Sequence, residues 1–229
     1  MLSTKVGRLL VAGEPSPLFA GAPPHGPVFD FSAEGVRRSL AESLERLGLD
    51  RVDVVLIHDP DDHLDQALAE AYPALDALRA EGVVRRIGAG MNQWQALARF
   101  VRETDLDCVL VAGRYTLLDR SAADELLPLC EARGCAVFAA GVLNSGLLAG
   151  GATFDYRPAS PEHLARARGL AETCERWGVP LEAAALQFPL RRLVVESILV
   201  GCRTPAEVDE DLALLEVPIP PGLWDELDA

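Results

Sequence analysis

The sequence predicts an α/β fold, a (β/α)8 TIM barrel that is N-terminally truncated to about six β/α units. Apolar runs of strand length alternate strictly with amphipathic segments of helix length, which indicates parallel strands joined by helical crossovers. The units recur every ~30 to 40 residues and no strand is followed by a G-x-G-x-x-G turn, so a barrel is favoured over an open doubly wound sheet. A complete barrel typically needs ~250 residues. With 229 residues, the chain is expected to lack two units at its N-terminus.

The strand at 52–57 is the clearest element, because its continuous β-branched run is typical of a strand covered on both faces. The helix before it has Ser32 as its expected N-cap and ends at Gly48, and its apolar residues recur at helical spacing. The same criteria predict strands at 2–11, 83–87, 108–112, 136–140 and 194–200, an irregular loop rich in Pro and Gly at 14–27, and helices at 64–79, 94–102, 122–132, 161–177, 182–188 and 206–215.

Composition indicates an ordinary globular chain, a single domain over 1–229, with 49% hydrophobic and 24% charged residues. The net charge of -14 repels phosphate backbones and anionic lipids, so nucleic acid and membrane surfaces are not expected partners. The five cysteines are scattered without a C-x-x-C pair, which favours reduced thiols and a cytoplasmic location. Neither a spanning apolar run nor a signal peptide is recognised.

Polar residues follow the strand at 52–57 in the order His-Asp-Pro-Asp-Asp-His, starting at His58. Parallel α/β folds place their chemistry at this end of the strands. Asp59, Asp61 and Asp62 resemble a carboxylate cluster for a metal, but Asp-Pro-Asp-Asp at a strand end is more often loop and helix-cap chemistry. We therefore predict no metal site. A second polar region is the glycine-rich loop at 141–151.

Several motifs agree in order and spacing with one known family. They are Ser-Thr-Lys-Val-Gly-Arg-Leu-Leu at 3–10, Arg-Ser-Leu at 38–40 with Ser-Leu-Glu-Arg-Leu-Gly at 43–48, Leu-Ile-His-Asp-Pro-Asp at 56–61, Gly-Ala-Gly-Met-Asn-Gln at 88–93, Ala-Gly-Arg-Tyr-Thr-Leu-Leu-Asp at 112–119 and Gly-Cys-Arg-Thr-Pro at 201–205. Together they resemble the aldo-keto reductase superfamily, in wording closest to its D-threo-aldose 1-dehydrogenase branch. The resemblance runs from residue 2 to about residue 215.

The resemblance implies a catalytic tetrad of Asp, Tyr, Lys and His, with the tyrosine as general acid and base. Carried over by motif, Lys5 is the tetrad lysine, whose charge lowers the pKa of the tyrosine, and His58 orients the substrate oxygen. In the family the Asp and Tyr precede the lysine strand, and this chain begins four residues before Lys5. Tyr72, Tyr115 and Tyr156 are expected to lie in a helix, at a strand end and in a late loop.

The resemblance also implies that NAD or NADP lies across the C-terminal rim of the barrel. Residues of the glycine-rich loop would offer N–H groups and hydroxyls to the pyrophosphate. Arg203 could pair with a 2′-phosphate and Glu207 could accept from a free 2′-hydroxyl, so both cofactors stay open, with a preference for NAD. The expected cofactor-binding residues are Asn92, Leu143, Asn144, Ser145, Gly146, Gly201, Arg203 and Glu207.

Two functions follow as hypotheses. The first is an NAD(P)-dependent oxidoreductase that oxidises an aldose such as L-fucose at C1, or reduces the corresponding carbonyl. The alternative is an inactive truncated barrel that at most binds the dinucleotide and self-associates through unpaired barrel edges. Auxiliary subunits of voltage-gated channels, built on the same barrel, are disfavoured because the motifs match the sugar dehydrogenase branch better.

Overall fold

The computed structural model describes residues 1–14, 21 and 23–228. These residues form two compact units, each made of two segments of the chain. The first unit comprises Met1–Leu110 and Ala132–Cys135, and the second comprises Val111–Glu131 and Ala136–Ala229. Strand β6 (Cys108–Ala112) contributes its first residues to the first unit and its last residues to the second.

The first unit is built on a sheet in which the strands follow the order β1-β4-β5-β6. Strand β1 pairs parallel with β4 and places Lys5 opposite Leu56, and β4 pairs parallel with β5. The predicted central strand is confirmed, since Val54, Val55, Leu56 and Ile57 are all buried. The bounds are β1 (Ser3–Val6), β4 (Val52–His58) and β5 (Val84–Met91).

Helix α1 (Ala33–Leu47) follows its sequence signals. The Ser32 side chain accepts a hydrogen bond from the Gly35 N–H, and Gly48 ends the helix in the left-handed conformation. The face with Val36 and Leu40 is buried. Further along the unit lie α2 (Leu64–Gln66), α3 (Tyr72–Ala80) and α4 (Trp94–Glu103).

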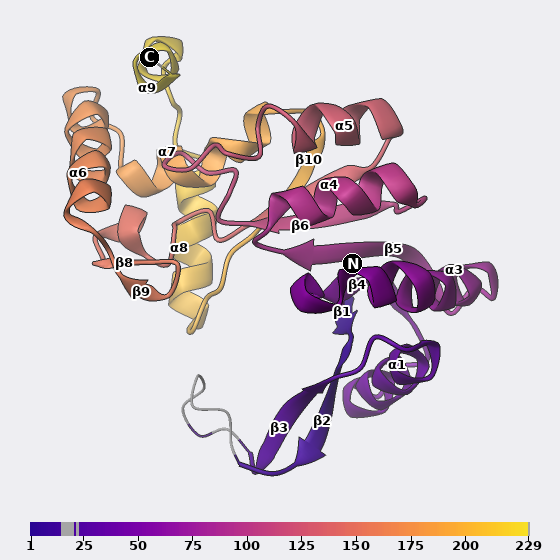
Figure 1. Ribbon diagram of the computed structural model, residues 1–229. Helices are drawn as coiled ribbons and strands as arrows, with labels where there is room; N and C mark the ends of the chain where they lie inside the picture. The colour runs from indigo at the N-terminus through magenta and orange to yellow at the C-terminus, as the bar shows by residue number, and fades with distance from the viewer. Residues whose placement is uncertain (15–20, 22, 229) are drawn as a thin grey trace. The chain divides into compact units, whose positions relative to one another are not determined.

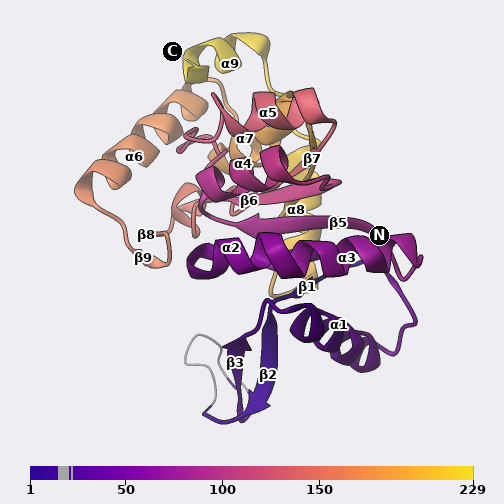
Figure 2. The ribbon, with the colours of Figure 1, turned by 45° about the vertical axis from the view of Figure 1, so that its right-hand side comes forward.

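The prediction of a single strand at 2–11 is wrong, because the chain turns at Gly7. Gly7 has a φ of 98°, in the region that favours glycine, and a side chain there would collide with the Phe31 ring. Strand β2 (Arg8–Ala12) leaves the sheet and pairs antiparallel with β3 (His25–Phe29), as Figures 1 and 2 show. The predicted loop at 14–27 therefore ends in a strand; residues 15–20 and 22 of that loop lie outside the described residues.

Two other expectations for the first unit need correction. The helix at 64–79 begins after a 3-10 turn at Asp61–His63 and contains a π-helical turn at Ala67–Ala71, although α2 and α3 run in line (Figure 2). Pro73 follows the π-helical turn. Because proline has no backbone N–H, it cannot donate a hydrogen bond to a carbonyl oxygen of that turn. The strand expected at 83–87 continues to Met91, because Gly88 and Gly90 let β5 lie close to its neighbours.

In the second unit, β7 (Ala136–Ala140) pairs parallel with β10 (Val195–Leu199). A short hairpin of β8 (Thr153–Phe154) and β9 (Arg157–Pro158) follows the glycine-rich loop. The helices are α5 (Leu126–Arg133), whose last two residues belong to the first unit, α6 (Pro161–Arg176), α7 (Leu181–Gln187), α8 (Pro205–Leu215) and α9 (Pro221–Asp228).

Several features of this unit differ from the sequence-based expectations, among them the β8–β9 hairpin, which is not predicted. The helix expected at 122–132 starts only at Leu126, after a series of turns in which Ala122 N–H donates to Arg114 O. Helix α9 was not predicted; it begins at Pro221 and buries Leu223 and Leu227. Within the described part of the chain, none of the helices has the length and apolar character needed to cross a membrane.

Candidate active site

Lys5 and His58, the two expected catalytic residues, lie together in the first unit. Lys5 projects from β1 and His58 is the last residue of the neighbouring strand β4. The Lys5 Nζ atom is 3.3 Å from His58 Nε2, within hydrogen-bonding distance. Two residues separated by more than fifty positions in the chain are thus brought together by one parallel strand pairing.

Arg8 and Asp59 join this pair, although neither is among the catalytic residues expected from the sequence, which considers Asp59 only as a possible metal ligand. Arg8 Nη2 is 2.5 Å from Asp59 Oδ2, and the same carboxylate oxygen is 3.3 Å from His58 Nε2. Asp59 adopts a φ of 44°, a left-handed conformation that Asp tolerates better than most residues. The available signal was Gly7, because a turn there returns Arg8 toward the strand ends that carry Lys5 and His58.

The surroundings favour a neutral imidazole. Burial, followed by the charges of Lys5 and Arg8, lowers the pKa of His58 from 6.5 to about 3. Partial desolvation by nearby protein atoms also lowers the pKa of the Lys5 ammonium, although the side chain keeps access to solvent, and the charge of Asp59 opposes this shift. Burial raises the pKa of Asp59, against the effect of Arg8. At neutral pH an unprotonated Nε2 can accept a hydrogen bond from the Lys5 ammonium.

A hollow of about 240 Å³ lies beside these residues. Aromatic rings form part of its wall: Phe29 and His63 have ring centroids 5.7 Å apart, and the Arg8 guanidinium lies 5.0 Å from the Phe29 centroid. Its lining residues come from the β2–β3 hairpin and from the ends of β4 and β5: Arg8, Phe29, Asp59, Asp61, Asp62, His63, Asn92 and Gln93. Asn92, an expected cofactor ligand, therefore belongs to the same part of the first unit as His58. Across the residues that the structure describes, His, Cys, Asp and Glu form no group suited to a metal ion.

The expected pyrophosphate turn is found in the second unit. Asn144 and Ser145 adopt left-handed conformations with φ of 48° and 56°, followed by Gly146 at 88°. The Asn144 N–H donates to Gly141 O and the Gly146 N–H donates to Leu143 O. The expectation that the turn offers its N–H groups to a ligand is therefore wrong for these two groups, which are used inside the turn.

The Asn144 side chain has an unusual environment. Its residue is 3% exposed, and neither its amide nitrogen nor its amide oxygen has a hydrogen-bond partner in the described part of the chain. A buried amide without partners is costly. The turn thus holds a donor and an acceptor that a bound molecule could satisfy.

The loop before α8 carries the remaining expected cofactor residues. Gly201 and Arg203 are exposed, and Arg203 is bonded to Glu207. Arg203 N–H donates to Glu207 Oε2 at 2.6 Å, and its Nη2 and Nε atoms donate to Oε1 at 2.7 and 3.1 Å. Donation from Arg203, chiefly from its backbone, lowers the pKa of Glu207. The two residues expected to compete for the ribose are thus partners of each other.

The three tyrosines occupy different surroundings. Tyr72, in the first unit, accepts from the Asp105 N–H, in the turn that leads into β6. His58 lies at the opposite, carboxyl end of the parallel strands, so Tyr72 does not join the Lys5–His58 pair. In the second unit, Tyr115 is buried against Phe188, and burial raises the pKa of its phenol, whereas Tyr156 is 85% exposed.

Relatives of this chain are dehydrogenases and reductases, and the chain is therefore an oxidoreductase. The model of the aldo/keto reductase family matches residues 1–229. The chain is 46% identical to the D-threo-aldose 1-dehydrogenase of a Pseudomonas species, over 99% of this chain and 73% of that protein. It is 40% identical to the pyridoxal 4-dehydrogenase of Microbacterium luteolum, over 99% and 74%.

The fold agrees with this result. The holo form of an aldo-keto reductase from Bacillus halodurans superposes with a TM-score of 0.72 over 99% of this chain and 71% of that one, at 23% identity. At this identity the likeness concerns the fold alone, which is of the TIM-barrel type. The chain belongs to the aldo/keto reductase family.

Proposed function

We propose that this chain is an NAD(P)-dependent oxidoreductase that oxidises an aldose of the L-fucose or D-threo type at C1, or reduces the corresponding carbonyl. The observation that carries the proposal is the Lys5 ammonium placed 3.3 Å from a half-buried, neutral His58. The similarity to a D-threo-aldose 1-dehydrogenase supports the choice of substrate. Because the chain is also similar to a pyridoxal 4-dehydrogenase, pyridoxal is the substrate to compare with the aldose.

His58 and Lys5 have separate tasks in this proposal. A neutral imidazole can hydrogen bond to the substrate oxygen and fix its position without adding charge. Lys5 places a positive charge beside that oxygen, which favours its deprotonated form during oxidation. The hydroxyl proton would pass to the tyrosine that the family's tetrad implies, whose pKa the same charge would lower. The chemistry that a bound nicotinamide would supply is an acceptor for the hydride of the substrate carbon.

The chain's own residues fit a dinucleotide. Asn144 holds a buried amide whose two polar atoms have no partner among the described residues, as a site for a polar ligand requires. In the first unit, Asn92 is the proposed ligand of the carboxamide. In the second unit, the turn Leu143–Gly146 is proposed for the pyrophosphate, and Gly201, Arg203 and Glu207 are proposed for the ribose. We infer a preference for NAD, because a 2′-phosphate would have to compete with Glu207 for Arg203.

The proposal is tested by Lys5→Met. Reduced nicotinamide should form when L-fucose and NAD⁺ are added to the wild-type chain, and the variant should lose at least about a hundredfold in turnover. Arg37→Met serves as control, because this exposed residue pairs with Glu81 and should leave the rate unchanged. Aldose-dependent reduction that survives in Lys5→Met would exclude the proposed role of Lys5.

A second readout uses the fact that Lys5 is the only lysine in the sequence. A carbon label in the lysine side chain therefore reports on this residue alone. Its resonance should titrate below the usual lysine range, as the lowered pKa requires, and should shift when dinucleotide and aldose are added together.

A second candidate function is dinucleotide binding without turnover. The observation in its favour is that Tyr72, the tyrosine of the first unit, bonds to Asp105 rather than to Lys5. Binding of NAD⁺ with no reduction in the presence of several aldoses and aldehydes would favour this candidate over the first.

A further inference from the structure

The β8–β9 hairpin is attached to the turn that carries Asn144. The Thr153 hydroxyl donates to the Ser145 carbonyl oxygen at 2.5 Å. The Tyr156 N–H donates to the Ser145 hydroxyl oxygen at 3.1 Å. Ser145 thus accepts from the first strand of the hairpin through its backbone and from the turn of the hairpin through its side chain.

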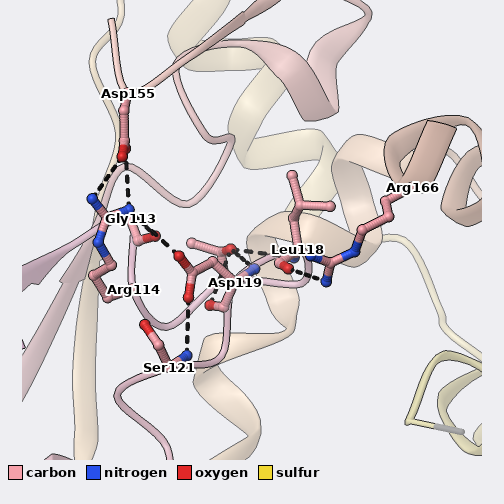
Figure 3. A network of polar contacts seen from close by, with 8 residues as sticks. Gly113, Arg114, Leu118, Asp119, Ser121, Asp155 and Arg166 are labelled. Atoms are coloured by element: carbon pink, nitrogen blue, oxygen red, sulfur yellow. Dashed lines mark hydrogen bonds and ion pairs between the residues drawn. The ribbon is translucent and has the colours of Figure 1, made fainter. Parts of the chain in front are cut away.

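The tip of the same hairpin is held by Arg114, which follows β6. Arg114 Nη1 and Nη2 contact Asp155 Oδ1 and Oδ2 at 3.1 and 2.6 Å, a two-pronged ion pair shown in Figure 3. Arg114 is itself oriented by Asp119, whose Oδ2 lies 3.4 Å from Nη1. Asp119 is fixed in turn, because its other carboxylate oxygen accepts from the Ser121 N–H. Such paired charged hydrogen bonds are strong and specific in geometry.

The backbone around Arg114 also contacts the start of the turn. The Gly113 N–H donates to Ala140 O at 2.8 Å, directly before Gly141. Gly141 has a φ of 62°, and a side chain built on it would lie 3.2 Å from Gly113 N. The segment with Arg114 therefore supports the glycine-rich loop at its beginning and, through Asp155, at the hairpin that follows.

Both connected segments have a strained backbone. Asn144 and Ser145 in the turn, and Asp155 and Tyr156 in the hairpin, have φ values of 48°, 56°, 48° and 62°. Asparagine and aspartate tolerate such angles, but serine and tyrosine rarely hold them unless surrounding contacts favour them, so the constraint is strongest at Ser145 and Tyr156. The contacts that impose them here are the bonds to Ser145 and the ion pair with Arg114.

We propose that Arg114 and Asp155 are positioning residues for dinucleotide binding. Their ion pair clamps the β8–β9 hairpin onto Ser145 and so keeps the Asn144–Ser145 turn in its left-handed conformation. In that conformation the Asn144 amide stays buried and without an internal partner until a dinucleotide binds. The inference rests on the proposed function, because it assumes that this turn receives the cofactor.

Asp155→Asn is the appropriate variant. Asparagine tolerates the left-handed conformation as well as aspartate does, so the change removes the charge and leaves the backbone preference intact. The hairpin keeps its other anchor, since the Phe154 ring stacks on His163 of α6 with centroids 4.0 Å apart. The variant is therefore expected to fold.

Asp228→Asn is the matched control from the same unit. Asp228 forms a two-pronged ion pair with Arg191, at 3.2 and 2.8 Å, and its 38% exposure is close to the 39% of Asp155. This pair lies at the end of α9 and makes no bond to Ser145. Asp228 also contacts Arg120 Nη1 at 2.9 Å, so its charge is paired at least as well as that of Asp155. Each variant therefore removes one arginine-paired carboxylate charge, and only Asp155 is connected to the turn.

Two measurements on the full chain decide the question. Hydrogen exchange without ligand should be about threefold to tenfold faster at the amides of the turn in Asp155→Asn, and unchanged there in Asp228→Asn. Titration with NAD⁺ should show a dissociation constant raised by a similar factor in Asp155→Asn alone. Equal exchange in the two variants, or faster exchange with unchanged affinity, would overturn the inference.

Failure of the proposed function has a different signature. If the wild-type chain bound neither NAD⁺ nor NADP⁺, the role of this turn in cofactor binding would be refuted together with the inference. The exchange comparison would still show separately whether the ion pair holds the turn.

Discussion

The two units hold their candidate residues by different physical means. In the first unit, Lys5 and His58 come from adjacent parallel strands, and the core strand β4 is buried from Val54 to Ile57. In the second unit, Asn144 sits in a turn with left-handed backbone, and the Arg203 side chain is 89% exposed on a loop. Strand pairing places side chains in the first case, whereas turn geometry and surface ion pairs place them in the second.

This difference sets the size of the expected effects. A desolvated group on a packed strand has its pKa shifted strongly, as His58 does, because the surroundings cannot relax. An exposed ion pair such as Arg203–Glu207 is screened by water and contributes little energy. Changes in the packed strands should therefore act on stability and proton binding, and changes in the exposed loop should act on cofactor preference.

The largest effect is expected for Gly88→Ala in β5. A methyl group there would collide with the Cys108 carbonyl oxygen of the neighbouring strand, so the free energy of unfolding should fall by about 1 to 3 kcal/mol. Gly169→Ala in α6 is the control, because its position opens to free space and alanine should raise stability there by about 0.5 to 1 kcal/mol. Denaturant unfolding measures both changes. Equal stability of the two variants would contradict the tight strand packing.

A smaller effect is expected for the dependence of the free energy of unfolding on pH. In the unfolded chain the imidazole of His58 has its ordinary pKa of about 6.5, and in the folded chain that pKa is lowered to about 3. Between these values the unfolded state binds more protons, so stability falls as the pH falls below 6.5. This group contributes a slope of at most about 1.4 kcal/mol per pH unit.

The comparison protein is His58→Gln, whose free energy of unfolding should depend less on pH between about 7 and about 5. Identical slopes in the two proteins would show that His58 titrates normally. Lys5→Met gives a further check by NMR titration, because the loss of this neighbouring charge should raise the pKa of His58.

The smallest effect is expected at the exposed pair in the second unit. Glu207→Gln frees Arg203 to meet a 2′-phosphate, so the ratio of the dissociation constants for NADP⁺ and NAD⁺ should fall by about twofold to fivefold. Glu210→Gln, on the same helix, is the control and should leave the ratio unchanged. A ratio that stays constant or rises in Glu207→Gln would refute the proposed role of this pair in cofactor choice.

Much of the fold could be predicted because its signals are local. The buried strand at 52–57, the Ser32 cap and the Gly48 stop each depend on residues close in sequence, and the structure confirms all three. The division of the predicted strand into β1 and β2 at Gly7 could not be predicted from neighbouring residues. It depends on the Phe31 ring, which fills the space beside Gly7 from more than twenty residues away.

The candidate site was predictable where a motif names single residues. The motifs identify Lys5 and His58, which the structure places within hydrogen-bonding distance. They do not identify Arg8 as a partner of Asp59, or the ion pair of Arg114 with Asp155. Those partners depend on contacts between segments far apart in the chain. The prediction that the turn offers its N–H groups to a ligand is wrong at Asn144 and Gly146 for a related reason, because both N–H groups donate to carbonyl oxygens inside the turn.

Whether this chain oxidises an aldose at C1 is tested most directly by following the transferred hydride. An aldose with deuterium at C1 is incubated with the wild-type chain and NAD⁺, and the reduced dinucleotide is analysed by mass spectrometry. The deuterium should be found in the nicotinamide ring, because the substrate carbon transfers its hydride directly. Reduced dinucleotide without the label, or none at all with any aldose or aldehyde, would contradict this expectation.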